Sequence, residues 1–287
     1  MIISVASGKG GTGKTTVAVN LASVLAKSRR VQFVDADVEE PNAAIFLKPD
    51  LTGSADVSVP VPVVDQARCT LCGLCAQVCA YNALVVGKKG VLVLPQLCHG
   101  CGGCRLMCPE EAVEEHDRLV GVVEWGQAGP LDFAHGRLEV GQPLAPPVIK
   151  ELKRRHLKER LVIIDSSPGT SCPMVTAVEG SDFCLLVTEP TPFGYSDLQL
   201  AVEVTRKLGV PAGVVINRSD VGDRRVDEYL ARENLPLLAS LPFDRKVAEV
   251  YARGESVAAA LPQWGRRFAR LANAIISIAG GAKRVKS

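Results

Sequence analysis

Short apolar runs alternate with amphipathic stretches along most of this chain. Continuous apolar runs of about four to eight residues are typical of parallel strands buried on both faces, whereas apolar positions three or four residues apart predict helices. The expected strands are Ile2–Ala6, 31–34, 161–165, Phe183–Thr188, 213–217 and Leu237–Leu241. The expected helices are 15–26, 150–160, 197–208, 226–233, 245–253 and 263–279. This order predicts an α/β fold with a doubly wound, mostly parallel sheet, whose ligand binds at the carboxyl ends of the strands.

The alternation stops in the first half of the chain. Proline and glycine become frequent after residue 46, and a cysteine-rich region follows. Asp37 and Asp165 both follow or end predicted strands, yet they lie too far apart in the chain for a short crossover. A small inserted domain would explain this gap. The expected units are residues 1–62 and 119–287 for the main domain and residues 63–118 for the insert.

Composition narrows the class of protein. The 287 residues are 47% hydrophobic and carry a formal net charge of +2, which gives no overall attraction to nucleic acid. We find no leader-like N-terminal segment and no apolar run of the roughly 20 residues that a spanning helix needs. We therefore expect a cytoplasmic chain without stable membrane insertion. Most of its ten cysteines fall in two tight repeats, which favours a metal centre in a reducing compartment over disulfides.

A glycine-rich loop follows the first predicted strand: Gly8-Lys9-Gly10-Gly11-Thr12-Gly13-Lys14-Thr15-Thr16. In such a loop the backbone N–H groups approach a β-phosphate, Lys14 reaches the phosphate charge, and the Thr15 hydroxyl can ligate Mg²⁺. Asp37, just past the second predicted strand, is placed to orient the attacking water or to hold Mg²⁺ through water, and Asp165 takes the analogous place at the end of its strand. For Asp35, capping of local backbone and a direct role both remain open. The expected nucleotide-binding residues are Gly10, Gly11, Thr12, Gly13, Lys14, Thr15 and Thr16.

The cysteines form two runs of one pattern, Cys69-x2-Cys72-x2-Cys75-x3-Cys79 and Cys98-x2-Cys101-x2-Cys104-x3-Cys108-Pro109. Three thiolates spaced in this way can bind one face of a cubane cluster, while the fourth points toward a second cluster. The ligands should therefore interleave. Zinc, the alternative, prefers paired ligands in separated knuckles. The expected sets are Cys69, Cys72, Cys75 and Cys108 for one cluster, and Cys98, Cys101, Cys104 and Cys79 for the other.

The segment from Lys9 to Thr16 resembles the deviant phosphate loop of the MinD, ParA, Mrp and nitrogenase iron protein group, which carries an extra lysine. The resemblance implies a dimer, of two copies or of this chain with a paralogue, that encloses two nucleotides. Lys9 would then cross to the phosphates of the other subunit, although a solvated loop lysine is the alternative. Asn217 resembles the residue that reads adenine in this group, which favours ATP; a plain turn asparagine is its alternative.

The cysteine region resembles bacterial two-cluster ferredoxins at all eight cysteines, which implies a small α+β fold with two [4Fe-4S] clusters. One position departs from the pattern, because Ala80 rather than proline follows Cys79. Cys172 stands seven residues after Asp165, as a cluster ligand does in the nitrogenase iron protein, so a redox role and a packing role are both open. Cys184, within an apolar run, is expected in the core.

The chain is thus identified as resembling the MinD-superfamily P-loop ATPases with an inserted ferredoxin domain. The expected activity is ATP hydrolysis, slow without a partner, that is coupled to electron transfer toward a redox partner protein. The catalytic residues would be Lys9, Lys14, Asp37 and Asp165. Two alternatives are a carrier that delivers iron-sulfur clusters to apoproteins and a positioning ATPase with redox-sensing clusters. Apolar residues at helical spacing from Trp264 onward predict either a helix that packs on the sheet or a membrane-binding helix.

Overall fold

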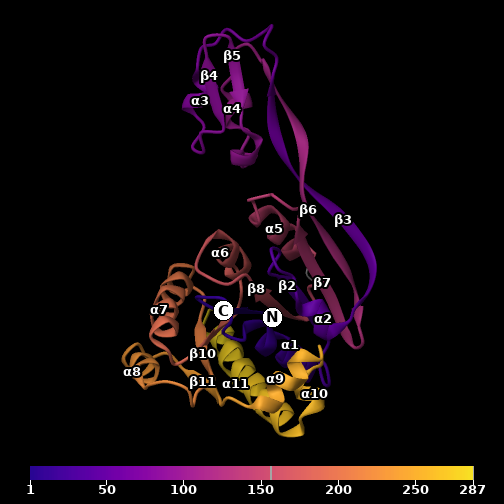
Figure 1. The fold of residues 1–287 in the computed structure, drawn as a ribbon, viewed down its shortest axis with the longest axis vertical. Coiled ribbons are helices and arrows are strands. Elements are labelled where there is room, and N and C mark those ends of the chain that lie inside the picture. The colour runs from indigo at the N-terminus through magenta and orange to yellow at the C-terminus, as the bar shows by residue number, and fades with distance from the viewer. Residues whose placement is uncertain (156, 287) are drawn as a thin grey trace.

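A single twisted sheet organises the main domain of the structure, a computed structural model that describes residues 1–155 and 157–286 (Figure 1). In this part of the chain the sheet has nine strands in the order β11-β10-β9-β1-β8-β2-β7-β6-β3. Seven of them run parallel: β1 (Ile2–Ala6), β2 (Val31–Ala36), β7 (Leu131–Leu138), β8 (Leu161–Ser166), β9 (Phe183–Thr188), β10 (Ala212–Asn217) and β11 (Leu237–Leu241). The prediction of a mostly parallel α/β sheet is confirmed.

Helices cover both faces of this sheet. One face carries α1 (Lys14–Leu25), α2 (Ala43–Leu47), α9 (Arg245–Ala252), α10 (Val257–Ala260) and α11 (Pro262–Lys286). The other face carries α5 (Pro146–Arg154), α6 (Cys172–Val178), α7 (Pro192–Lys207) and α8 (Arg225–Arg232). Prolines open α5, α7 and α11, where the missing N–H would have no helical partner. Burial of apolar side chains on both faces makes the central strands continuous apolar runs, as the sequence pattern indicates.

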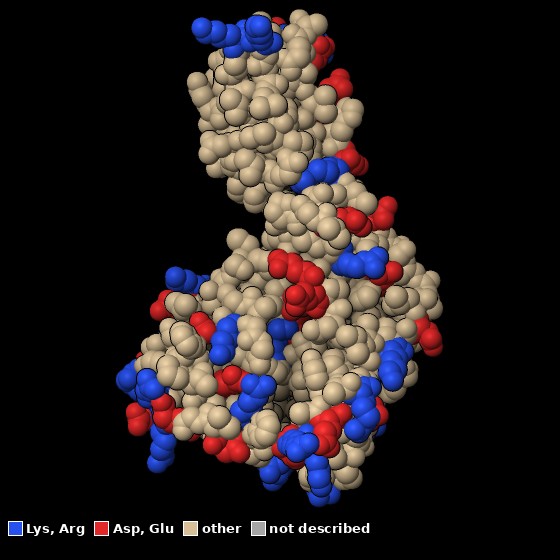
Figure 2. All heavy atoms as spheres, viewed as in Figure 1, with Lys and Arg blue, Asp and Glu red and all other residues tan. Residues whose placement is uncertain are grey.

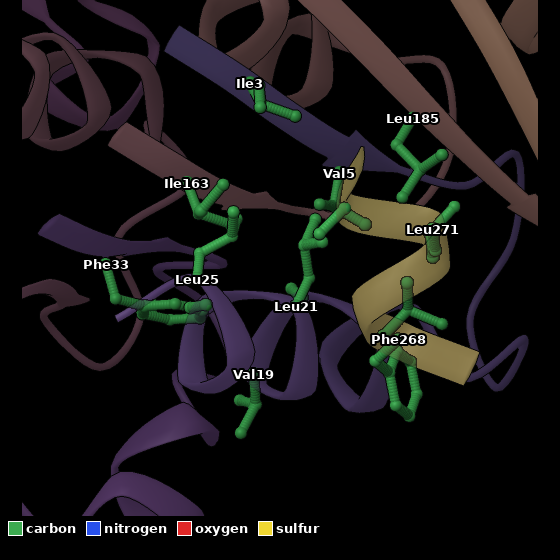
Figure 3. Close-up of a cluster of buried hydrophobic side chains, with 14 of the residues drawn as sticks. Ile3, Val5, Val19, Leu21, Leu25, Phe33, Ile163, Leu185, Phe268 and Leu271 are labelled. Carbon is green, nitrogen blue, oxygen red and sulfur yellow. The ribbon is translucent and has the colours of Figure 1, made fainter. Parts of the chain in front are cut away.

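The largest buried cluster lies between β1, β2, β8, α1 and α11. Figure 3 shows Leu21 and Leu25 of α1 directed toward the strands, with Phe268 and Leu271 on the neighbouring helix α11; all four belong to this cluster. Phe268 is 1% exposed. The structure therefore agrees with the packing interpretation of the C-terminal helix, and none of the described helices is long and apolar enough to cross a membrane.

Three neighbouring strands at one edge were not predicted: β7 and two long antiparallel strands. β3 (Asp50–Val64) pairs with β6 (Val113–Ala128), which in turn pairs with β7. The sequence pattern missed β3 because Pro60 and Pro62 read as breaks, whereas an edge strand tolerates proline. It missed β6 because the residues of this strand are largely half-buried or exposed and form no continuous apolar run. The two strands continue as a ribbon past the last pair between β6 and β7, at Gly121. Residues 55–64 of β3 and 113–123 of β6, which form this ribbon and its base, are here called the β3/β6 ribbon.

Residues 65–112, here called the cysteine segment, occupy the far end of the β3/β6 ribbon (Figure 1). Because β3 runs in the same direction as the parallel strands, it carries the chain past their carboxyl ends. Figure 2 shows charges of both signs interleaved over the main domain, whereas the visible face of the cysteine segment is largely uncharged. The segment contains α3 (Leu74–Gln77), β4 (Leu84–Gly87), β5 (Gly90–Val93), a 3-10 helix (Pro95–Leu97) and α4 (Gly103–Leu106).

Candidate functional site

The glycine-rich loop connects β1 to α1 at the carboxyl edge of the sheet. Gly13 has φ +87°, and a Cβ there would lie 2.5 Å from Asn217 Nδ2, so both the backbone conformation and the space require glycine. A Cβ on Gly8 would lie 2.2 Å from the carbonyl oxygen of Asp197. The loop thus presents its backbone, without intervening side chains, at the N-terminus of a twelve-residue helix. That arrangement suits a phosphate group.

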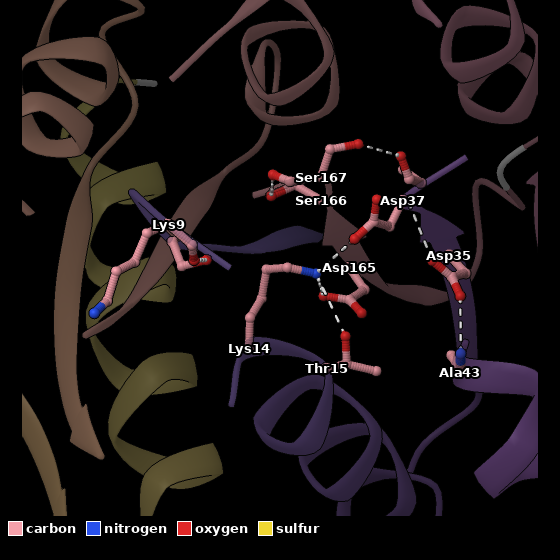
Figure 4. A network of polar contacts seen from close by, with 11 residues as sticks. Lys9, Lys14, Thr15, Asp35, Asp37, Ala43, Asp165, Ser166 and Ser167 are labelled. Atoms are coloured by element: carbon pink, nitrogen blue, oxygen red, sulfur yellow. Dashed lines mark hydrogen bonds and ion pairs between the residues drawn. The ribbon is translucent and has the colours of Figure 1, made fainter. Parts of the chain in front are cut away.

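Lys14 lies at the centre of a buried ionic network (Figure 4). Its Nζ is 2.6 Å from Asp165 Oδ1, 3.6 Å from Asp37 Oδ2 and 3.4 Å from Thr15 Oγ1. Burial lowers the pKa of Lys14, but the charges of Asp165 and Asp37 outweigh this effect and raise it overall. The structure therefore brings together four of the residues that the sequence singles out.

Two oxygen atoms of the glycine-rich loop and this network lack a partner among the described residues. They are Asp165 Oδ2 and Thr12 Oγ1, both buried. Buried polar atoms are normally hydrogen-bonded, so oxygens of this kind at a phosphate-type loop indicate a site built for a ligand. Carboxylate and hydroxyl oxygens are also the donors that Mg²⁺ prefers. The remaining carboxylate, Asp37, has its pKa raised to about 6 by burial, against the opposing effect of Lys14.

Asp35 caps backbone N–H groups next to this network. Its carboxylate accepts the backbone N–H of Asp37 at 3.1 Å and that of Ala43 at 3.0 Å. These two bonds fix the turn that places Asp37 beside Lys14, which agrees with the capping interpretation. Burial and the charge of Asp165 raise the pKa of Asp35 to about 8.

Lys9 lies apart from this network. Its Nζ is 3.8 Å from Glu189 Oε2, while Glu189 Oε1 accepts a hydrogen bond from Arg218 Nη1 at 2.6 Å. The Lys9 side chain is 31% exposed, and it points away from Lys14 in Figure 4. Lys9 is thus not a freely solvated lysine in this state. Glu189, which the sequence did not single out, holds it within its own subunit.

Asn217 stands against the glycine-rich loop, where its Nδ2 donates to the carbonyl oxygen of Thr12 at 2.8 Å. It lines a cavity of about 360 Å³ that also includes Lys14 and Asp37. The same cavity is also lined by residues that the sequence did not single out. They directly follow the ends of β10 and β11, and this position at the carboxyl edge of the sheet could have indicated them. These residues are Arg218, Pro242, Phe243 and Asp244.

The eight cysteines of the two runs line two small cavities of about 20 Å³ each. Among the described residues, no group of three or more His, Cys, Asp or Glu side chains is arranged to hold a single metal ion. The two cavities nevertheless divide the cysteines into the interleaved sets expected from their spacing. The first cavity includes Cys69, Cys72, Cys75 and Cys108, and the second includes Cys98, Cys101, Cys104 and Cys79.

The two cavities are built alike. The N–H of Ala83 lies 3.3 Å from Cys79 Sγ, and the N–H of Ala112 lies 3.3 Å from Cys108 Sγ. Burial raises the pKa of the Cys75 and Cys104 thiols, one in each cavity. In each cavity, a backbone N–H four residues after the last cysteine of a run thus lies at the same distance from the sulfur of that cysteine.

The two remaining cysteines lie outside these cavities. Cys172 is exposed at the first position of α6. Cys184 is fully buried in β9, and burial raises its pKa to about 12, as suits a core residue. The core position predicted for Cys184 is confirmed.

A parallel sheet with a glycine-rich loop between its first strand and first helix defines a P-loop nucleotide-binding protein. More narrowly, the chain belongs to the CobQ/CobB/MinD/ParA nucleotide binding domain family, whose model matches residues 3–257. The resemblance to the MinD and ParA group is confirmed at this level.

Relatives in sequence and structure agree with this assignment. An uncharacterized protein of Methanocaldococcus jannaschii is 30% identical over 265 residues, which is 89% of this chain and 91% of that protein. An iron-sulfur cluster carrier protein of Aquifex aeolicus is 26% identical and covers 97% of this chain, with 66% of its own length matched. The septum site-determining protein MinD of Pyrococcus horikoshii, solved with Mg-ADP, has a TM-score of 0.60 at 22% identity, with 98% of each chain covered. The last similarity concerns the fold alone.

Proposed function

We propose that this MinD/ParA-type ATPase is a dimeric iron-sulfur protein that couples Mg·ATP binding and hydrolysis to electron transfer through two [4Fe-4S] clusters. The observation that carries the proposal is the division of eight cysteines into two cavities, on a ribbon that extends past the nucleotide edge of the sheet. The cysteine segment is then an inserted domain of bacterial ferredoxin type. Its clusters, when bound, would supply one-electron redox chemistry.

The residues of the cysteine segment suit this role. Each cavity takes three thiols from one run and one from the other, which is the ligand pattern of two-cluster ferredoxins. The N–H groups of Ala83 and Ala112 stabilise negative charge on the sulfurs of Cys79 and Cys108. The alanine after Cys79 leaves the sulfur and its N–H donor in place, so we expect both clusters to bind.

At the nucleotide site, Lys14 would exchange its carboxylate partner Asp165 for a phosphate of the bound nucleotide. A bound phosphate would compete with Asp165 for the Lys14 ammonium and would release the carboxylate toward the water shell of Mg²⁺. Thr15 would ligate the metal directly, and Asp37 would hold it through water and orient the attacking water. The orphaned oxygens of Asp165 and Thr12 support this assignment.

Lys9 would act across the dimer. Within one subunit it is held 3.8 Å from Glu189. A second copy, or a paralogue, that closes over ATP would offer it a phosphate with a higher charge than one carboxylate. A cation supplied in this way stabilises the charge that develops on the transferring phosphoryl group. We therefore expect slow hydrolysis by the isolated subunit, in which Lys9 is paired with Glu189 rather than with a phosphate.

A second candidate is a carrier that delivers clusters to apoproteins. Curated relatives from Aquifex aeolicus and Pyrococcus furiosus are named iron-sulfur cluster carrier proteins, at 26% and 28% identity. Cys72 and Cys101, one in each cavity, are exposed, which gives an acceptor thiol access to each cluster. Transfer of iron to an apoprotein, rather than of electrons, distinguishes this candidate.

The decisive experiment uses protein purified and reconstituted without oxygen. We expect about eight iron atoms per chain and an electron paramagnetic resonance signal of reduced clusters after dithionite treatment. Mg·ATP should alter that signal in the native protein and leave it unchanged in the Lys14→Ala variant. Cys108→Ser should lose iron, whereas Cys184→Ala serves as the matched control and should retain it. Loss of the clusters to an added apoprotein would favour the carrier, and absence of any cluster signal would overturn both candidates.

A further inference from the structure

The loop of residues 167–171 links the nucleotide site to α6. Its Gly169 N–H donates to the carbonyl oxygen of Ser7 at 2.9 Å, and the Ser167 hydroxyl donates to the carbonyl oxygen of Ala36 at 3.2 Å. Pro168 lines the nucleotide cavity. A γ-phosphate placed here would compete for these donors, as it does in other P-loop proteins whose loops it orders. This step rests on the proposed nucleotide function.

Helix α6 begins directly after this loop, and its other end is held by Lys153 of α5. The Lys153 ammonium donates to the carbonyl oxygens of Thr176 at 2.7 Å and Ala177 at 3.3 Å, and also to that of Glu179. The last carbonyl groups of a helix have no partner within the helix, and a cation there also interacts favourably with the helix dipole. Lys153 therefore joins α5 to the carboxyl end of α6.

Helix α5 in turn rests on the base of the β3/β6 ribbon. A Cβ on Gly121 of β6 or on Gly136 of β7 would lie 2.7 Å from a methyl carbon of Val148, so glycine is what allows α5 this close approach. One continuous apolar cluster then spans α6, α5 and both ribbon strands, and Figure 1 shows α5 between α6 and β6. Its members include Ala177, Val148, Leu152, Val57, Val59, Val120 and Val123.

We propose that Lys153 couples the nucleotide state of the 167–171 loop to the β3/β6 ribbon through α6 and α5. A movement of the loop shifts α6, and the three carbonyl bonds to Lys153 make α5 follow. Because well-packed side chains do not deform continuously, a displaced α5 changes the equilibrium between arrangements of the ribbon base. The cysteine segment at the end of the ribbon changes position with it.

The test measures amide hydrogen exchange in the full chain, with Mg·ADP and with a non-hydrolysable Mg·ATP analogue. In the native protein we expect nucleotide-dependent exchange both in the loop of residues 167–171 and in the ribbon, residues 55–64 and 113–123. Lys153→Met should keep the loop response and reduce the ribbon response at least about fivefold. Lys153→Arg should retain both responses. Lys150→Met, which removes an exposed lysine from the same helix, is the matched control and should also retain both.

Three outcomes would contradict the proposal, and two further measurements keep the test decisive. A ribbon response in Lys153→Met equal to that of the native protein would overturn it, and so would a native loop response without a ribbon response. If Lys153→Met fails to fold, Lys153→Gln keeps donors without the charge and should show an intermediate ribbon response. Iron content and the resonance signal are measured on the same samples, because missing clusters would refute the proposed electron transfer and leave the coupling intact. No loop response in the native protein would refute nucleotide sensing and the coupling together.

Discussion

Replacement of Lys14 by methionine should destabilise the nucleotide-free protein, because two buried carboxylates then lose their counter-ion. Lys14 Nζ lies 2.6 Å from Asp165 and 3.6 Å from Asp37. With an effective dielectric constant of about 20, these distances correspond to attractions of about 6 and about 5 kcal/mol. Burial of the ammonium offsets a large part of this gain. Removal of one partner of a buried pair typically costs about 3 to 5 kcal/mol, and we expect a loss in that range.

The assay is urea denaturation at pH 7, followed by circular dichroism, in a double-mutant cycle with Asp165→Asn. Asp165→Asn alone should also destabilise the protein, since it leaves the ammonium with Asp37 only. The double variant Lys14→Met/Asp165→Asn should recover part of the loss, because Asp165, the nearer carboxylate, is then neutral and only Asp37 has lost its counter-ion. Lys27→Met, at an exposed position just after α1, is the control and should change stability by less than about 0.5 kcal/mol. Strictly additive losses in the double variant would refute the reasoning.

Three further predictions concern other parts of the main domain. The pKa of Asp35 is raised to about 8 from 3.8, so between those pH values the folded protein holds a proton that the unfolded chain has released. The contribution of Asp35 to the free energy of unfolding should therefore fall as pH rises from about 4 to about 8, by at most about 1.4 kcal/mol per pH unit. Asp35→Asn should remove this contribution and flatten the slope in denaturation curves. Gly13→Ala forces a methyl group against Asn217 at a positive φ, and calorimetry should show ATP binding weakened by roughly tenfold or more. Phe268→Ala should cost about 3 to 5 kcal/mol of stability by leaving a cavity in the core, whereas Phe193→Ala, at a residue 78% exposed, should cost less than about 0.5 kcal/mol. An equal loss in these two phenylalanine variants would contradict the packing described here.

The sequence predicted six of the seven parallel strands, because their residues are buried on both faces and read as unbroken apolar runs. It missed β7 (Leu131–Leu138), whose apolar run is interrupted by Asp132, His135 and Gly136. The interleaved cysteine sets stay a prediction as ligand sets, although the same sets line the two cavities. They rest on a different reason, because the spacing within each run restricts which thiols can share a site. The β3/β6 ribbon escaped prediction because its strands are half exposed and contain Pro60 and Pro62. Pattern alone does not distinguish a loop from an edge strand that tolerates proline.

Contacts between segments that are distant in the sequence could not be predicted from the sequence pattern either. Glu189 lies at the end of β9, and only the order of strands in the sheet brings it to Lys9. The same holds for Lys153, whose partners are backbone carbonyl oxygens that carry no sequence signal. Asp35 shows the reverse case, since its position in the pattern allowed two roles, and only the hydrogen bonds to Asp37 and Ala43 distinguish them.

The ribbon also makes the cysteine segment separable from the enzyme that carries it. Chain enters through β3 and returns through β6 as neighbouring antiparallel strands, paired from Asp50 with Gln127 to Val64 with Val113. In topology this is a hairpin whose turn has been replaced by residues 65–112. Hairpin tips accept insertions readily, since the rest of the sheet is unaffected by what joins the two strands. Acquisition or loss of the cysteine segment during evolution would therefore require no redesign of the nucleotide site, and we expect related ATPases to differ here by the presence or absence of the whole segment.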